Sequence, residues 1–111
     1  MTQRDTDPNA AVDYILKNAP KFAKAKAARV YLEEFRKSKK ALLMSESTAE
    51  AANAREQYAY AHPEYIALLA GLKDAVEIEE RLRWDMVAAQ ARVEIWRTES
   101  ANNRLQDRAT R

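Results

Sequence analysis

Apolar residues recur at alternating intervals of three and four from Tyr65 to Trp96. A helix turns once in about 3.6 residues, so this spacing places them in one stripe along a helix. No proline interrupts residues 64–103, over which we predict one long helix. The stripe, which we call the main seam, comprises Tyr65, Leu68, Leu72, Ala75, Glu79, Leu82, Met86, Ala89, Val93 and Trp96. Because helices gain most of their stability from packing an apolar face, another element must cover the main seam.

The first half of the chain carries a stripe with matching spacing. Its members are Ala25, Ala28, Leu32, Phe35 and Leu42. They predict a helix over 21–44 whose stripe faces the main seam. Asp7 followed by Pro8 is a helix start signal, and Pro20 disfavours helical angles in the residue before it. We therefore predict a separate short helix over 8–19.

A third helix is predicted over 48–61. Ser47 and Glu50 have the spacing of a capping box, in which each side chain bonds a free backbone N–H of the first turn. His62 and Pro63 end this helix. The chain either turns there or continues as a kinked rod, and we favour a turn.

The long helix has a second apolar side, opposite the main seam. Its members are Ile66, Trp84, Ala88, Ala91 and Ile95. A helix that is apolar on two sides is typical of a bundle or of an oligomer contact, so we expect a partner on this side. Gly71 is unfavourable within a helix and is expected to mark a close helix crossing.

These elements predict a single all-α domain over 1–111. We expect an elongated helical hairpin or bundle that self-associates, with one long C-terminal helix and flexible tails at 1–6 and 104–111.

Composition excludes several kinds of chemistry. The chain has no cysteine, one glycine and one histidine, so it lacks thiolate metal sites, glycine-rich phosphate loops and the usual nucleophile motifs. We expect no enzymatic activity, no cofactor and no metal, with a structural role for His62. No apolar run approaches the roughly 18 residues of a membrane span. We therefore expect a cytoplasmic protein with no membrane partner.

Charge is segregated along the chain. Residues 17–40 carry nine basic and two acidic side chains, whereas 41–80 carry two basic and eight acidic ones. Five cations fall within a sector of about 100° on the predicted second helix. We call Lys26, Arg29, Arg36, Lys37 and Lys40 the basic strip. Such a strip either neutralises phosphates of single-stranded DNA, with Tyr31 as the nearest aromatic, or is a solvated helix face.

Two segments carry a resemblance to known proteins. The run HPEYI at 62–66 begins the long helix, and EIWR occurs at 94–97. Residues 61–97 resemble small helical proteins of tailed bacteriophages and, more loosely, UvsY-like recombination mediators. The resemblance implies an oligomeric accessory protein in the host cytoplasm that binds single-stranded DNA and helps a recombinase displace single-strand-binding protein. The basic strip would then contact phosphates, and Trp84 and Ile95 would join subunits.

A second functional class stays open. The two-sided long helix is also typical of a protein–protein interaction module, such as a phage-encoded inhibitor of a host protein or a virion component.

Overall fold

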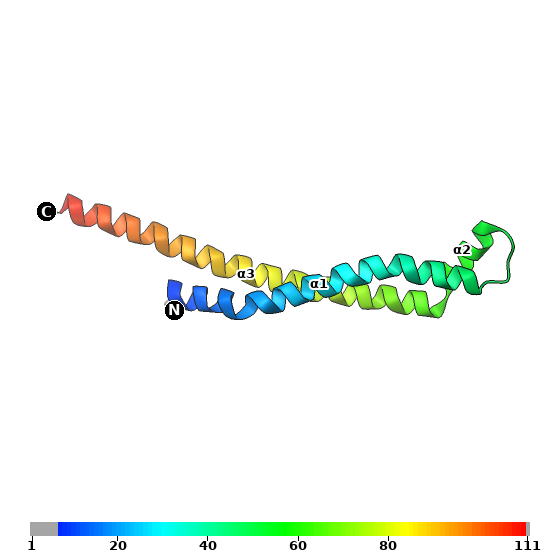
Figure 1. The fold of residues 1–111 in the computed structure, drawn as a ribbon. Helices are drawn as coiled ribbons and strands as arrows, with labels where there is room; N and C mark the ends of the chain where they lie inside the picture. The colour runs from blue at the N-terminus through cyan, green and yellow to red at the C-terminus, as the bar shows by residue number, and fades with distance from the viewer. Residues whose placement is uncertain (1–6, 111) are drawn as a thin grey trace. The chain divides into compact units, whose positions relative to one another are not determined.

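A computed structural model describes residues 7–110, which contain three helices (Figure 1). These are α1 (Pro8–Glu46), α2 (Ala52–Ala61) and α3 (Pro63–Ala109). No strand occurs within the described range. The predicted all-α class with a long C-terminal helix is therefore confirmed. The predicted tail at 1–6 lies outside the described residues.

The chain divides into two compact units, and both long helices contribute to each. Unit 1 contains residues 8–22 of α1 and 81–109 of α3. Unit 2 contains residues 23–80, which include the rest of α1 and α3 and all of α2. Within each unit the segments of α1 and α3 run antiparallel (Figure 1).

Helix α1 begins as predicted but does not break at Pro20. The Asp7 carboxylate accepts hydrogen bonds from the backbone N–H groups of Asn9 (2.9 Å) and Ala10 (3.4 Å), which caps the helix. Pro20 is an exposed residue inside α1, so the predicted boundary between 8–19 and 21–44 is wrong. Proline inside a helix removes one backbone hydrogen bond. Packing of the residues on either side against α3 offsets that cost.

The main seam is the packed face of α3. In unit 2 its residues are buried or half-buried from Tyr65 to Glu79, and in unit 1 from Leu82 to Val93. Trp96 is the exception, because 43% of its surface is exposed. Tyr14 lies beside Asp85 in unit 1, so α1 begins too near that point for its first turn to extend over Trp96.

The packed face of α1 in unit 2 differs from the predicted one. Leu42 is 55% exposed, whereas Leu43 is completely buried and packs with Ala59 of α2 and Tyr65 of α3. Ala28 is also exposed. The buried and half-buried positions with alternating spacing are Ala25, Arg29, Leu32, Arg36, Lys39 and Leu43. Three cations thus occupy packing positions of α1.

The loop before α2 does not form the predicted capping box. Ser47 Oγ accepts a hydrogen bond from the N–H of Ala49 at 3.2 Å, and α2 begins only at Ala52. Arg55 donates to the backbone carbonyls of Ala49 and Glu50. These bonds hold the loop in a non-helical conformation, so the predicted start at 48 is wrong.

His62 separates α2 from α3. Its backbone is extended (φ −67°, ψ 135°), and α2 does not continue along the axis of α3 (Figure 1). The favoured turn is therefore present. His62 Nδ1 accepts a hydrogen bond from the N–H of Glu64 at 3.0 Å, and the ring makes an edge contact with Tyr58. These contacts assign His62 a capping role at the start of α3.

Two further predictions about α3 are wrong. Gly71 does not mark a helix crossing, because a Cβ atom added there would meet nothing within 4 Å. The helix also continues to Ala109, six residues beyond the predicted end at 103. Arg108 in the last turn is a favourable charge for the negative end of the helix dipole. Thr110 Oγ1 bonds the carbonyl of Asp107 at 3.1 Å.

Candidate nucleic-acid interface

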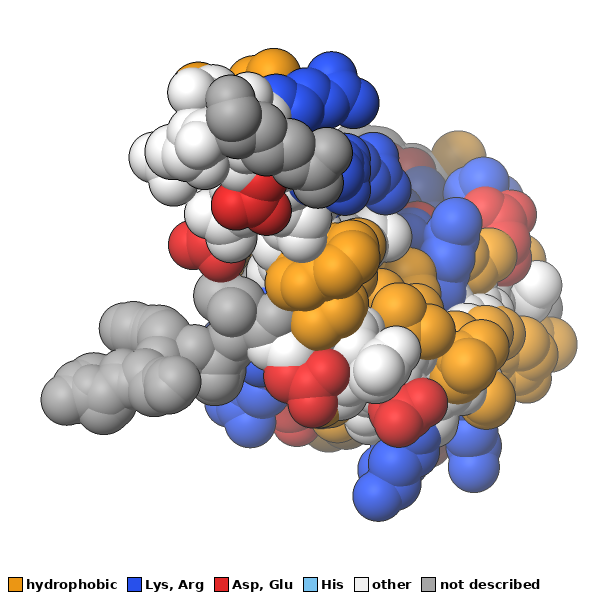
Figure 2. Space-filling model, turned by 90° about the vertical axis from the view of Figure 1, so that its left-hand side faces the viewer, with side chains coloured by type: hydrophobic (Ala, Val, Ile, Leu, Met, Phe, Trp, Pro, Cys, Tyr) orange, Lys and Arg blue, Asp and Glu red, His pale blue; other side chains and the backbone are white. Residues whose placement is uncertain are grey.

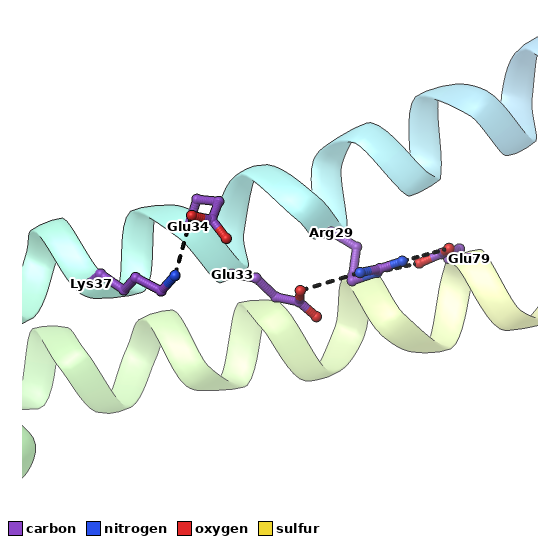
Figure 3. Close-up of polar contacts among 5 residues, drawn as sticks. All are labelled: Arg29, Glu33, Glu34, Lys37 and Glu79. Carbon is purple, nitrogen blue, oxygen red and sulfur yellow. Dashed lines mark hydrogen bonds and ion pairs between the residues drawn. The ribbon is translucent and has the colours of Figure 1, made fainter.

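Arg29 is the basic-strip residue whose environment differs most from the prediction. It lies on the packed face of α1 and forms two hydrogen bonds with Glu79 of α3, Nε to Oε1 at 2.6 Å and Nη2 to Oε2 at 3.1 Å (Figure 3). Nη1 also reaches Glu33 at 3.2 Å. The only polar member of the main seam is thus paired with a cation from the opposite helix.

This pairing shifts the pKa values of both side chains. Glu79 is buried with 6% of its surface exposed, and the hydrogen bond from Arg29 holds its pKa below the usual range. The same bond raises the pKa of Arg29. A guanidinium that satisfies a buried carboxylate is held in place by the fold. We therefore leave Arg29 out of the candidate phosphate-binding surface.

Lys40 is also held by neighbours. Its ammonium donates to Glu56 of α2 at 2.7 Å and lies 4.6 Å from the centre of the Tyr60 ring. Hydrogen bonds to Glu56 and Tyr60 raise the pKa of Lys40. These contacts connect α2 to α1, so Lys40 mainly positions the short helix.

The other three residues of the basic strip make fewer or weaker contacts with carboxylates of the chain. Lys37 is exposed and reaches Glu34 only at 3.4 Å, a surface pair that contributes little (Figure 3). Lys26 is exposed, and Arg36 is half-buried. Within residues 7–110, Arg36 has no hydrogen bond or ion pair with another side chain.

Arg36 and Lys37 border an open groove of about 610 Å³ in unit 2. Its lining residues are Arg36, Lys37, Lys40, Ala41, Met44, Tyr60 and Tyr65. The rings of Tyr60 and Tyr65 meet edge to face with centroids 5.4 Å apart. Tyr65 is buried, whereas Tyr60 is 45% exposed, with the Lys40 ammonium over its ring. Cations and an accessible aromatic ring therefore share one concave surface.

The aromatic part of this groove was absent from the sequence prediction. Tyr31, the predicted aromatic, stacks on Phe35 with centroids 5.8 Å apart and is not a lining residue. Tyr60 reaches the groove because the chain reverses between α1 and α2. A useful signal was the pair of tyrosines at 58 and 60 in the predicted third helix, since a turn before that helix brings them back to the end of α1.

The second apolar side of α3 is exposed within each unit. Ile66 in unit 2 is 54% exposed, and in unit 1 the corresponding values are 58% for Trp84 and 49% for Ile95. Ala88 and Ala91 are also exposed. The Arg83 guanidinium lies 4.7 Å from the Trp84 ring centre. Figure 2 shows apolar side chains at the surface beside charged ones. About half of the surface of each large side chain on this side is therefore open to solvent.

A smaller hollow of about 170 Å³ lies in unit 1 between α1 and α3. It is lined by Tyr14, Asp85, Ala88, Ala89 and Arg92. Desolvation and the neighbouring carboxylate of Asp85 raise the pKa of Tyr14. Asn18, also in unit 1, is buried and donates to the Tyr14 carbonyl at 2.8 Å.

Neither a metal site nor a membrane span is apparent in the described part of the chain. Residues 7–110 contain no group of three or more His, Cys, Asp or Glu side chains placed to hold a metal ion. None of the helices there has an apolar stretch of the length that a bilayer crossing needs. The chain matches no protein-family model, no curated protein and no solved structure.

Proposed function

We propose that this chain is a non-catalytic protein that binds single-stranded nucleic acid in the groove of unit 2. Arg36 and Lys37 contact backbone phosphates, and a base stacks on Tyr60. The observation that carries the proposal is the shared concave surface of these three side chains. Proteins that bind single strands combine cationic grooves with aromatic rings in this way, because every base has a face that can stack.

The pairing of the other cations supports this choice of residues. Arg29 and Lys40 are bonded to carboxylates of the same chain, so phosphate binding there would break ion pairs that hold the helices. Lys37 would lose only a weak surface contact with Glu34. Arg36 is half-buried at the groove wall and gains a charged partner on binding.

The test is fluorescence anisotropy with labelled single-stranded and double-stranded DNA over a series of salt concentrations. Arg36→Gln with Lys37→Gln should weaken single-strand binding and reduce the slope of log affinity against log salt by about 1.4, since each lost phosphate contact removes about 0.7. The matched control is Lys17→Gln with Lys21→Gln, which removes two exposed cations of α1 outside the groove. This control should leave the slope nearly unchanged.

Stacking is tested separately with Tyr60→Ala. Loss of one base–aromatic contact costs about 1–3 kcal/mol of binding free energy. Tyr31→Ala removes another exposed tyrosine of unit 2 and should bind like the wild type. Circular dichroism of each variant checks that the helices persist. Equal affinities for the Tyr60 and Tyr31 variants would contradict the stacking role, and no binding even at low salt would overturn the proposal.

A recombination-mediator role is the finer form of this proposal. It rests on the resemblance of residues 61–97 and would place a recombinase and single-strand-binding protein among the partners. The measurement is the rate of strand exchange by a recombinase on DNA coated with single-strand-binding protein, with and without this chain. Stimulation that the groove variant abolishes would support the role, and no stimulation would restrict the function to DNA binding.

The second candidate function is a helical protein–protein interaction module, either a phage-encoded inhibitor of a host protein or a virion component. The observation that favours it is the exposure of large apolar side chains on α3, among them Ile66, Trp84 and Ile95. Exposed apolar patches are typical of interaction sites. Absence of DNA binding, together with specific capture of one protein that Trp84→Ala abolishes, would select this function.

A further inference from the structure

Four exposed residues on α3 in unit 1 have a spacing that reads the same in both directions. Trp84, Ala88, Ala91 and Ile95 are separated by four, three and four positions. Trp84 and Ile95 are 58% and 49% exposed, and both alanines are exposed. At about 100° per residue these four side chains fall within a narrow sector of the helix. We call them the symmetric stripe.

We propose that the symmetric stripe joins two copies of this chain as an antiparallel helix pair. A two-fold axis passing between positions 89 and 90 places Trp84 opposite Ile95 of the second copy. The same axis places Ala88 opposite Ala91 of the second copy. Contacts across a two-fold axis use the same patch on both subunits, and a palindromic spacing meets that requirement.

The sizes of the side chains fit the antiparallel arrangement. The two alanines lie at the centre, where small residues allow two helices to approach closely, and the large residues lie at both ends. Each end then packs one tryptophan against one isoleucine. A parallel pair would also place alanines against alanines, but it would put two tryptophans at one end and two isoleucines at the other, so the two ends would hold the helices at unequal distances.

The charges beside the stripe are complementary in the same arrangement. Asp85 and Arg92 each follow a stripe residue by one position, so both lie along one edge. In an antiparallel pair this edge meets its own copy, which brings Asp85 near Arg92 of the second copy and repeats the contact by symmetry. Both side chains belong to exposed residues, and both also line the hollow beside Tyr14 of their own chain.

The contact is small, which determines how the dimer behaves. Four side chains with their neighbours on one helix form an interface at the low end of the range for specific complexes, below about 1,200 Å². We therefore expect a reversible dimer whose population rises with protein concentration. This association is independent of nucleic acid, so it is measured on the free protein.

Sedimentation velocity over a concentration series provides the first test. The wild type should shift from monomer to dimer, and Trp84→Ala should move the midpoint to at least tenfold higher concentration. Trp96→Ala is the matched control, because Trp96 is 43% exposed on the same helix but lies about 120° around it from Trp84. A monomeric wild type at all concentrations, or equal effects of the two tryptophan variants, would overturn the proposal.

Cysteine cross-linking tests the direction of the pair. The chain has no cysteine of its own, so single-cysteine variants report one position each. A mixture of Ala88→Cys and Ala91→Cys proteins should form disulfide-linked heterodimers faster than either variant alone forms homodimers, since disulfides need Cβ atoms about 3.5–4.5 Å apart. Faster homodimer formation by Ala88→Cys would indicate a parallel pair and overturn the proposal.

Discussion

Truncation of Leu43 to alanine tests the helix packing of unit 2 most directly. Leu43 is the largest completely buried side chain among the described residues, and it contacts Ala59 and Tyr65 from the other two helices. The substitution removes three carbon atoms, worth about 0.8 kcal/mol each in transfer free energy, or roughly 2.4 kcal/mol. A residual cavity adds to this cost. We expect Leu43→Ala to lower the free energy of unfolding by about 2–4 kcal/mol.

Leu42→Ala is the matched control for this measurement. Leu42 is the adjacent residue with the same side chain, but it is 55% exposed. Its truncation should lower the free energy of unfolding by less than about 1 kcal/mol, because less than half of the leucine side chain is removed from water and the transfer free energy of the lost carbons is reduced in proportion. The small helix-propensity change from leucine to alanine is common to both variants and cancels in the comparison.

The Tm of both variants is measured by thermal unfolding, monitored by circular dichroism at one fixed protein concentration. In a domain of about 100 residues, 1 kcal/mol corresponds to a shift in Tm of at least about 4 °C, so Leu43→Ala should lower the Tm by about 8 °C or more. A larger loss for Leu42→Ala than for Leu43→Ala would refute the packing. That result would instead support the stripe predicted from the sequence, in which Leu42 faces α3.

Two other substitutions test the long helices. Gly71→Ala should stabilise the protein by about 0.5–1 kcal/mol in urea unfolding, because Gly71 is helical and its surroundings have space for a Cβ atom; a loss of stability would mean that another chain packs closely at this point. Glu79→Gln should flatten the acid unfolding profile. Arg29 holds the pKa of Glu79 below its ordinary 4.5, so ionised Glu79 stabilises the fold above that pH, and this contribution is lost as the pH falls through the lowered pKa. Glu34→Gln, at an exposed carboxylate, should instead follow the wild-type profile, and equal profiles for both variants would contradict the assignment.

Local sequence signals predicted one helix boundary correctly and two incorrectly. Asp7 and Pro8 correctly indicate the start of α1, because the cap needs only neighbouring backbone groups. Pro20 does not end the helix, since packing on either side outweighs one lost hydrogen bond. The capping-box pattern at Ser47 fails because Arg55 holds the loop carbonyls in another conformation.

The packed face of α1 was mispredicted for a physical reason. Arg29, Arg36 and Lys39 occupy half-buried positions on this face, and an apolar pattern search passes over charged residues. Long cationic side chains cover apolar surface with their aliphatic carbons while their charged ends find water or a carboxylate. Lys39, for example, reaches Glu64 at the start of α3, and this bond lowers the pKa of Glu64.

The sequence alone determined that this chain is helical and which side of α3 is packed. Helical periodicity depends on residues three or four positions apart, so the main seam is readable without knowing what covers it. Tertiary structure alone decided that Arg29 is paired with Glu79 and that Tyr60 joins Arg36 and Lys37 in one groove. These contacts join separate helices, and their formation depends on the register and turns that bring those helices together.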